Sequence, residues 1–210
     1  ILGSLTLLSS MDDEPFSDEA QRLLYIAQEN GKRLHALVND ILDFEKFSAR
    51  QMRFTLARHQ IVGLVEEAVL ANMVLMDKYD IRLHIECPDR SLAAQVDSKR
   101  FHQVMTNLLT NAAKFAEKGS QVEVAVEGHT KNVRISVSND GDGIPEAFRD
   151  QIFKPFAQVA PSATRARGGT GLGLNITKQI VEQTGGKIGF ESAEGGRTTF
   201  WFTVPVNQPV

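Results

Sequence analysis

DSKRFHQVMTNLLTNAAKF, residues 97–115, is the stretch of this sequence that says most about the fold. Asp97 can cap a helix, and the residues after it predict one helix to the end of the stretch. Asn107, Asn111 and Lys114 are spaced i, i+4 and i+7, so they share one face at about 3.6 residues per turn.

This polar face lies on a helix that is otherwise largely apolar. Two amides and an amine are costly to bury together unless they meet something polar. Amide oxygens suit a hard cation such as Mg²⁺, and a lysine suits phosphate. A solvated helix face is the alternative, and the neighbouring apolar residues disfavour it: Leu108, Leu109, Ala112 and Ala113.

Two glycine-rich stretches are further candidate sites. GGTGLGL, residues 168–174, opens a predicted helix, where free backbone amides attract phosphate. Alone it is weak evidence, because a tight turn with close helix packing has the same composition. NDGDGIP, residues 139–145, follows a predicted strand and lacks the six oxygen ligands at loop spacing that calcium needs. It predicts a polar side chain at a narrow cleft.

The composition is that of a globular protein. The chain has 210 residues, of which 42% are hydrophobic and 23% charged, enough apolar content to bury a core. The net charge of −3 gives no sequence-wide basic footprint for nucleic acid. A single cysteine excludes an intramolecular disulfide and a cysteine-built zinc site. No apolar run approaches the roughly 18 residues of a membrane span.

Residues 1–52 predict a helical hairpin. A short first helix is followed, after a break at 11–16, by a long helix that Ser17 can cap. In the long helix Ala27, Leu34 and Ile41 repeat every seven residues, as in a coiled coil. Because the first helix is too short to cover this stripe, we expect the hairpin to dimerise as a four-helix bundle. A helical pair packed on its own domain is the alternative.

Residues 53–210 predict a second domain of mixed helices and strands. The order does not alternate strictly, which favours an α+β fold: a two-layer α/β sandwich with a mixed sheet covered by helices on one face. Helices are expected at 61–79, 97–115 and 171–184, and strands at 53–59, 81–87, 122–126, 133–137, 187–191 and 198–204.

Taken together and in this order, these features resemble the ATP-binding catalytic domain of sensor histidine kinases. That domain belongs to a superfamily shared with DNA gyrase, mismatch-repair and heat-shock chaperone ATPases. The resemblance covers essentially the whole chain. It rests on an asparagine box (107–115), a first glycine box (139–144), a phenylalanine box (153–156) and a second glycine box (169–174).

The resemblance implies ATP and Mg²⁺ as cofactors. Asn111 would coordinate the magnesium, and Asn107 and Lys114 would contact the phosphates or their waters. The segment 157–169 would be a lid over the nucleotide. The other residues implied in nucleotide binding are Phe115, Asn139, Gly141, Gly143, Ile144, Phe156, Gly169, Thr170, Gly171, Leu172, Gly173, Leu174 and Thr198.

The first glycine box departs from the family at one position. Two residues before its first glycine the family usually has an aspartate that accepts the adenine amino group, and this chain has Asn139. An amide oxygen can accept the same hydrogen bond, although its NH₂ adds donors. Asp140 would take that place only after a register shift that displaces both glycines.

The family's phospho-acceptor histidine motif is missing from residues 1–210. We therefore expect the acceptor to lie upstream, and residues 1–52 to be a truncated dimerisation and histidine-phosphotransfer hairpin. The implied function is a protein-histidine kinase core of a two-component system. Its implied partners are a second copy, an upstream sensor domain and a response-regulator receiver domain, without nucleic acid or membrane contact, and its implied location is cytoplasmic.

Two other functions compete with this one, and the sequence supports only the first of them. A degenerate kinase that binds nucleotide and acts through its dimer scaffold is favoured by Asn139. A chaperone-like or topoisomerase-like ATPase would need a hydrolytic glutamate on the asparagine-box helix, where Gln103 and Asn107 stand instead.

The missing acceptor gives a first prediction. We expect this chain to bind ATP–Mg²⁺ without labelling itself on histidine, because none of its five histidines lies in an acceptor motif. Radiolabelled ATP tests this. Acid-labile label that disappears in His35→Ala would mean that His35, on the hairpin, is the acceptor.

Overall fold

The computed structural model describes residues 2–9, 16–49, 51–158, 170–193 and 195–206, and it consists of two compact units, Ile1–Gln51 and Met52–Val210. None of the described helices combines the length and the apolarity needed to cross a bilayer.

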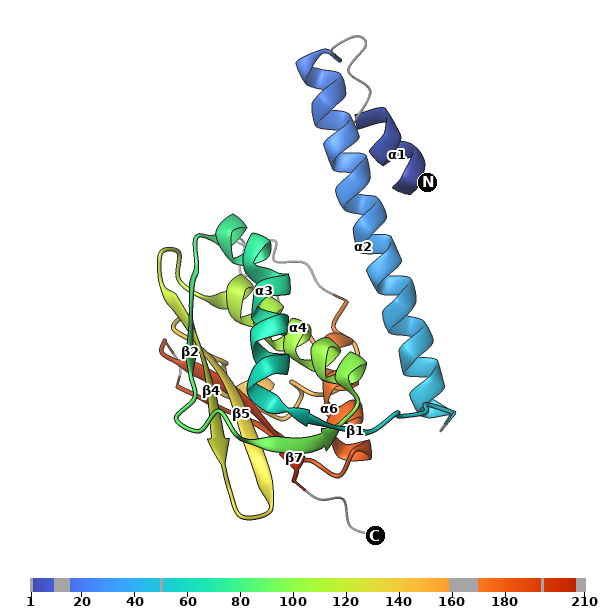
Figure 1. Ribbon diagram of the computed structural model, residues 1–210. Helices are drawn as coiled ribbons and strands as arrows, with labels where there is room; N and C mark the ends of the chain where they lie inside the picture. Colours follow the sequence, from blue (N-terminus) through green and yellow to red (C-terminus); the bar gives the residue numbers. More distant parts are fainter. Residues whose placement is uncertain (1, 10–15, 50, 159–169, 194, 207–210) are drawn as a thin grey trace. The chain divides into compact units, whose positions relative to one another are not determined.

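The described residues of the first unit form two helices, α1 (Leu2–Ser9) and α2 (Asp18–Ser48) (Figure 1). Ser17 caps α2, since its Oγ accepts a hydrogen bond from the Ala20 backbone N–H at 3.3 Å. The Gln28 Nε2 on α2 donates to the Leu5 carbonyl oxygen on α1 at 3.0 Å. The two helices therefore lie side by side, as the sequence predicts.

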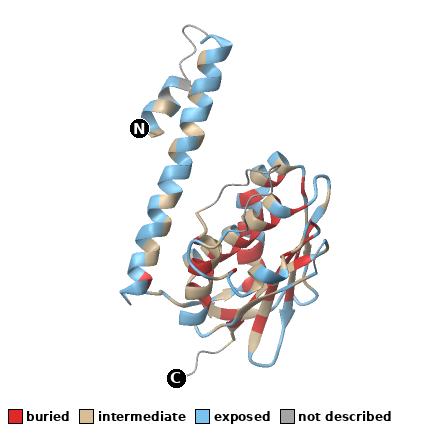
Figure 2. Cartoon of the chain, turned by 180° about the vertical axis from the view of Figure 1, so that it is seen from behind, coloured by how far each residue is buried: buried red, intermediate tan, exposed pale blue. Residues whose placement is uncertain are grey.

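The apolar stripe of α2 is exposed in the single chain. Leu34 and Ile41, two members of the predicted seven-residue repeat, are both exposed, and so are Leu23 and Ile26 near the start of the helix. Figure 2 shows α2 almost entirely in the colours of exposed and half-buried residues.

The second unit combines a mixed sheet with helices. Its elements are β1 (Ala57–Gln60), α3 (Ile61–Tyr79), β2 (Arg82–Glu86), β3 (Ala93–Val96), α4 (Ser98–Phe115), β4 (Gln121–Gly128), β5 (Asn132–Asn139), α5 (Glu146–Arg149), α6 (Gly173–Gln183), β6 (Ile188–Ser192) and β7 (Thr198–Pro205).

Five of the strands form one sheet in the order β2-β4-β5-β7-β6. The β2–β4 pair is parallel and the other pairs are antiparallel, so the sheet is mixed. Helices α3, α4 and α6 lie on one face of it (Figure 1). The predicted α+β sandwich is confirmed. β1 and β3 form a separate antiparallel pair.

The core lies between that sheet face and the helices. Alternate residues of the central strands are buried there, which is the period of two expected when one face is covered. Figure 2 shows the buried residues gathered in this layer. They include Val122, Val124 and Val126 of β4, Val133, Ile135 and Val137 of β5, Phe200 and Phe202 of β7, and Met105, Leu108 and Leu109 of α4.

Two elements were not predicted, β3 and α5. β3 reads AAQV, with little intrinsic preference for a strand, and its pairing with β1 depends on a partner more than thirty residues away. α5 is a single turn of four residues.

The turn between α6 and β6 gives a stability prediction. A Cβ at Gly186 would overlap the backbone carbonyl oxygen of Thr203, which leaves no flexible group to move aside. Gly186→Ala is expected to lower the free energy of unfolding by about 2 kcal/mol or more. Gly63→Ala is the control, since a Cβ there meets nothing within 4 Å and the helix gains about 0.5–1 kcal/mol. Urea titration measures the free energy of unfolding of both variants. Equal values for Gly186→Ala and Gly63→Ala would contradict the close packing of Gly186 against Thr203.

Candidate functional site

The asparagine box forms the second half of α4. Asp97 caps this helix through a hydrogen bond from the Arg100 N–H to its Oδ1, 3.1 Å long. Asn111 and Lys114 are half-buried on one face. The side chain of Asn111 makes no hydrogen bond with any residue that the structure describes, so its amide remains available to a ligand.

The first glycine box is attached to the end of α4. Ala116 and Gly141 form an isolated antiparallel β-bridge, and the Glu117 N–H donates to the Asp140 carbonyl oxygen at 2.9 Å. A Cβ at Gly141 would overlap the carbonyl oxygen of Phe115. Only glycine allows this approach, and it brings together two sequence motifs predicted to share one site.

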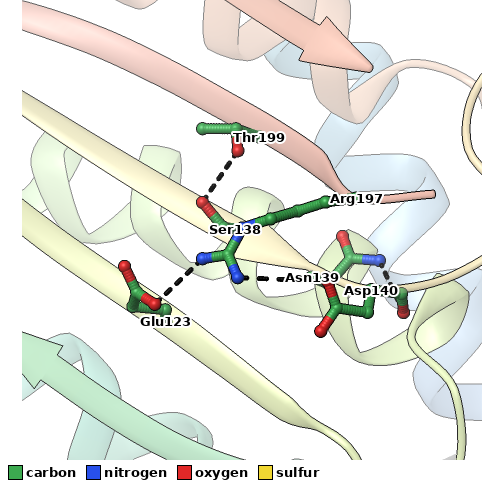
Figure 3. Close-up of polar contacts among 6 residues, drawn as sticks. All are labelled: Glu123, Ser138, Asn139, Asp140, Arg197 and Thr199. Carbon is green, nitrogen blue, oxygen red and sulfur yellow. Dashed lines mark hydrogen bonds and ion pairs between the residues drawn. The ribbon is translucent and has the colours of Figure 1, made fainter. Parts of the chain in front are cut away.

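Asn139 and Asp140 point in different directions (Figure 3). Asn139 ends β5 opposite Thr198 of β7 and is 4% exposed. The Asp140 side chain is 53% exposed and faces the Arg197 guanidinium at 3.9 Å. The buried position is therefore held by the amide, and Asp140 lies outside it, as expected without a register shift.

The Asn139 amide has only a weak partner. Its Nδ2 approaches the Asp140 carbonyl oxygen at 3.4 Å, long for a hydrogen bond. No other hydrogen bond of this side chain occurs within the described ranges. A buried amide with so little protein bonding has capacity left for a ligand.

The tip of the β6–β7 hairpin holds the other side of the first glycine box. The Ile144 N–H donates to the Ser192 Oγ at 2.9 Å, and that hydroxyl lies 2.7 Å from the Thr198 Oγ1. The Gly195 N–H donates to the Asp142 carbonyl oxygen at 2.8 Å. Ile144 and Thr198, both predicted site residues, are thus joined through Ser192.

The second glycine box opens α6, as predicted. The helix begins at Gly173, and its N-cap residue, Leu172, has no side chain that can cap it, unlike Ser17 of α2 and Asp97 of α4. The N–H groups of its first turn carry partial positive charge. Gly171 has φ +72°, and a Cβ there would lie 2.8 Å from the Phe156 backbone. This contact joins the phenylalanine box to the second glycine box.

Asn107 connects the two helices of the site. Its Nδ2 donates to the Gly173 carbonyl oxygen at 3.1 Å and to the Thr177 Oγ1 at 3.2 Å. Both amide hydrogens are therefore used to hold α6 against α4, and a predicted phosphate contact through this nitrogen would have to displace them. Its Oδ1 is the atom left for a ligand or a water.

The other predicted residues differ in how far they are exposed. The side chains of Leu172 and Ile144 are buried, so they shape the site by packing, whereas Phe115 and Phe156 are exposed. Gly143 takes a left-handed φ of +71°, and Thr170, Gly173 and Leu174 are half-buried around the start of α6. Gly169 lies outside the described residues, as does the predicted lid beyond Gln158.

Sequence reasoning missed three polar residues of this region. Thr177 and Ser192 make the links described above, and Asn175 of α6 is buried and donates from Nδ2 to the Phe153 carbonyl oxygen at 2.9 Å. The position of Thr177, one helical turn after Gly173, was the available signal for the first. Ser192 and Asn175 form hydrogen bonds with residues far away in the sequence, so no local pattern indicated them.

The side-chain oxygens at this site fit a magnesium ion that is bound by the protein and by a ligand at the same time. In the described part of the chain, no three His, Cys, Asp or Glu side chains gather into a metal site. Mg²⁺ is commonly held by one or two protein oxygens together with substrate phosphates and waters. The uncommitted amide of Asn111, one helical turn from Lys114, matches that need.

Comparison with known proteins agrees with this geometry. The model of the family described as "Histidine kinase-, DNA gyrase B-, and HSP90-like ATPase" matches residues 96–208. The sensor histidine kinase WalK of Bacillus subtilis is 33% identical over 199 residues, which are 91% of this chain and 31% of WalK. The chain spans a third or less of the length of the curated relatives it matches.

Two solved structures are similar over nearly the whole chain. Full-length ShkA in complex with AMPPNP has a TM-score of 0.80 and 26% identity, covering 100% of this chain and 43% of that one. The histidine kinase ThkA in complex with the response regulator TrrA has a TM-score of 0.72 and 25% identity, covering 98% and 57%. The chain therefore belongs to the family of histidine kinase-, DNA gyrase B- and HSP90-like ATPases, and within it this chain is similar to sensor histidine kinases.

Proposed function

We propose that this chain is the core of an ATP-dependent protein-histidine kinase of a two-component system. Residues 53–210 would form the ATP-binding catalytic domain, and residues 1–52 part of the dimerisation and histidine-phosphotransfer hairpin. The observation that carries the proposal is the convergence of the asparagine box and both glycine boxes on the second half of α4, through the Ala116–Gly141 bridge and the Asn107–Gly173 hydrogen bond.

The residues near α4 and α6 suit the phosphates of ATP. The Asn111 amide oxygen would hold Mg²⁺, and Lys114 would place a positive charge beside a phosphate. The backbone N–H groups at the start of α6 would donate hydrogen bonds to further phosphate oxygens. Bound Mg²⁺ would offset negative charge on the phosphates, which is the main requirement of phosphoryl transfer.

The first glycine box suits the base. The Asn139 Oδ1 would accept a hydrogen bond from the adenine amino group, and Thr198, opposite it in the β5–β7 pair, would line the same pocket. Gly141 and Gly143 keep the pocket free of side chains. The exposed ring of Phe115 would lie along the adenine or the ribose.

The transfer itself needs a nucleophile from the hairpin. An imidazole nitrogen would form a bond to the γ-phosphorus as the bond to the bridging oxygen breaks, and ADP would leave. The imidazole proton would pass to solvent. The catalytic domain thus positions the phosphates and needs no nucleophile of its own. The site residues named above, which are amides, a lysine and glycines, suit that role.

The partners are part of the same proposal. The exposed apolar residues of α2, Leu23, Leu34 and Ile41 among them, would be covered by a second copy in a four-helix bundle. A receiver domain of a response regulator would dock on the hairpin and accept the phosphoryl group on an aspartate. The ThkA–TrrA complex supports that kind of partner.

A nucleotide-binding regulator without productive transfer is the second candidate. It is favoured by the buried amide of Asn139, whose NH₂ brings donors that a carboxylate lacks. Adding γ-labelled ATP–Mg²⁺ and a separate dimerisation hairpin with an acceptor histidine distinguishes the two. Labelled hairpin supports the kinase; nucleotide binding without labelled hairpin supports the regulator; ATP hydrolysis without label on protein contradicts both.

Asn111→Ala tests the proposed metal ligand. We expect it to abolish the Mg²⁺-dependent part of ATP binding, at least a tenfold rise in Kd or about 1.4 kcal/mol. The reason is that the substitution removes the only proposed protein oxygen on the cation. Calorimetry with AMPPNP, with and without Mg²⁺, measures the change.

The control is Gln183→Ala, which removes an exposed amide from α6 of the same domain. It should leave nucleotide affinity as in the unchanged chain, and both variants should unfold at the same temperature within a few degrees. Equal Mg²⁺ dependence in Asn111→Ala and the unchanged chain would remove Asn111 from the site.

A further inference from the structure

The guanidinium of Arg197 joins three separate parts of the second unit (Figure 3). Arg197 lies just before β7, at the tip of the β6–β7 hairpin. Its Nη2 is 2.9 Å from the Glu123 Oε2 on β4, and its Nη1 is 3.9 Å from the Asp140 Oδ1 in the first glycine box. Glu123, Asp140 and Arg197 are called here the Arg197 cluster.

The Arg197 cluster acts where the first glycine box leaves the sheet. Asp140 directly follows Asn139, and its carbonyl oxygen accepts the hydrogen bond from Glu117 that docks the box on α4. The same residue is therefore held by its backbone on one side and by its carboxylate on the other. The guanidinium is suited to this task, because its several donors can serve two carboxylates at once.

The cluster also keeps the Asp140 carboxylate away from the buried position. Asn139 and Asp140 are neighbours, and only one of their side chains can occupy the pocket. The Asp140 carboxylate faces the Arg197 guanidinium, while Asn139 stays inside, 4% exposed. Without the guanidinium, the Asp140 carboxylate would lose its ion pair. The turn formed by the first glycine box would then lose one of the contacts that hold it in place.

We propose that Arg197 is a positioning residue for the nucleotide site, which acts through Asp140 and Glu123 to hold the first glycine box in its binding conformation. The inference rests on the proposed function, because it assigns the base pocket to that box. Arg197 itself does not touch the ligand in this proposal. Its effect on binding is indirect, through the placement of Asn139 and Gly141.

The chain offers a matched control in Arg134. This arginine of β5 pairs with Glu191 at 2.9 Å and lies over the Trp201 ring at 4.5 Å, on the same sheet. Arg134→Met therefore removes one charge and one ion pair within the same sheet, as Arg197→Met does at Glu123, but it removes no contact to a glycine box. A general loss of sheet stability would appear in both variants.

The experiment compares Arg197→Met, Arg134→Met and Asp140→Asn in the full chain. We expect Arg197→Met to raise the Kd for AMPPNP–Mg²⁺ about threefold to fivefold, the upper range for a partly exposed ion pair. Asp140→Asn should give a similar rise, and the double variant should add nothing more, because both changes break the Arg197–Asp140 ion pair that holds the glycine box. Arg197→Lys should recover part of the affinity, and Arg134→Met should bind normally.

A second measurement does not depend on nucleotide. Hydrogen exchange without ligand should be faster in Arg197→Met at the Glu117 and Gly195 amides, which bond to the carbonyl oxygens of Asp140 and Asp142. Arg134→Met should leave these amides as they are.

The outcomes separate this inference from the proposed function. Failure of the unchanged chain to bind AMPPNP would contradict the proposed function, and exchange would still show whether Arg197 holds the box. Unchanged exchange at both amides in Arg197→Met would overturn the inference. So would an unchanged Kd, or an equal rise in Kd in Arg134→Met.

Discussion

The contact between Gly141 and the carbonyl oxygen of Phe115 is the constraint on which the site depends. A side chain at position 141 would overlap that oxygen, so the Ala116–Gly141 bridge exists only with glycine. The bridge joins the end of α4, which carries Asn111 and Lys114, to the turn that carries Asn139. Polar groups more than twenty residues apart thereby meet at one place.

The remaining links fix the same turn and the start of α6. The β6–β7 hairpin holds the turn through Ser192, Gly195 and Arg197. Asn107 holds the first turn of α6, because its amide donates to the Gly173 carbonyl oxygen and to the Thr177 hydroxyl. Backbone groups make many of these links. Such an arrangement leaves the side chains of Asn111 and Asn139 with little protein bonding, which is what a ligand site needs.

The two units of the chain differ in how they can be stable. The second has a continuous core between one sheet face and three helices. The first exposes a stripe of apolar residues, including Leu34 and Ile41, along a helix of 31 residues. Exposed apolar surface of this extent is typical of an interaction site, and a second copy is the partner that we propose for it on the basis of its seven-residue repeat.

Local rules were enough to determine much of this protein from sequence. The α3 helix, the capping of α2 by Ser17 and of α4 by Asp97, and the polar face of α4 follow from periodicity and side-chain chemistry. The ordered boxes pointed to the family. Tertiary structure alone decided the strand β3, the use of Asn107 to hold α6, and the ion pairs of Arg197 with Asp140 and Glu123. These depend on partners far away in the chain, and no local pattern specifies which of many possible polar pairs the folded backbone brings within a hydrogen bond.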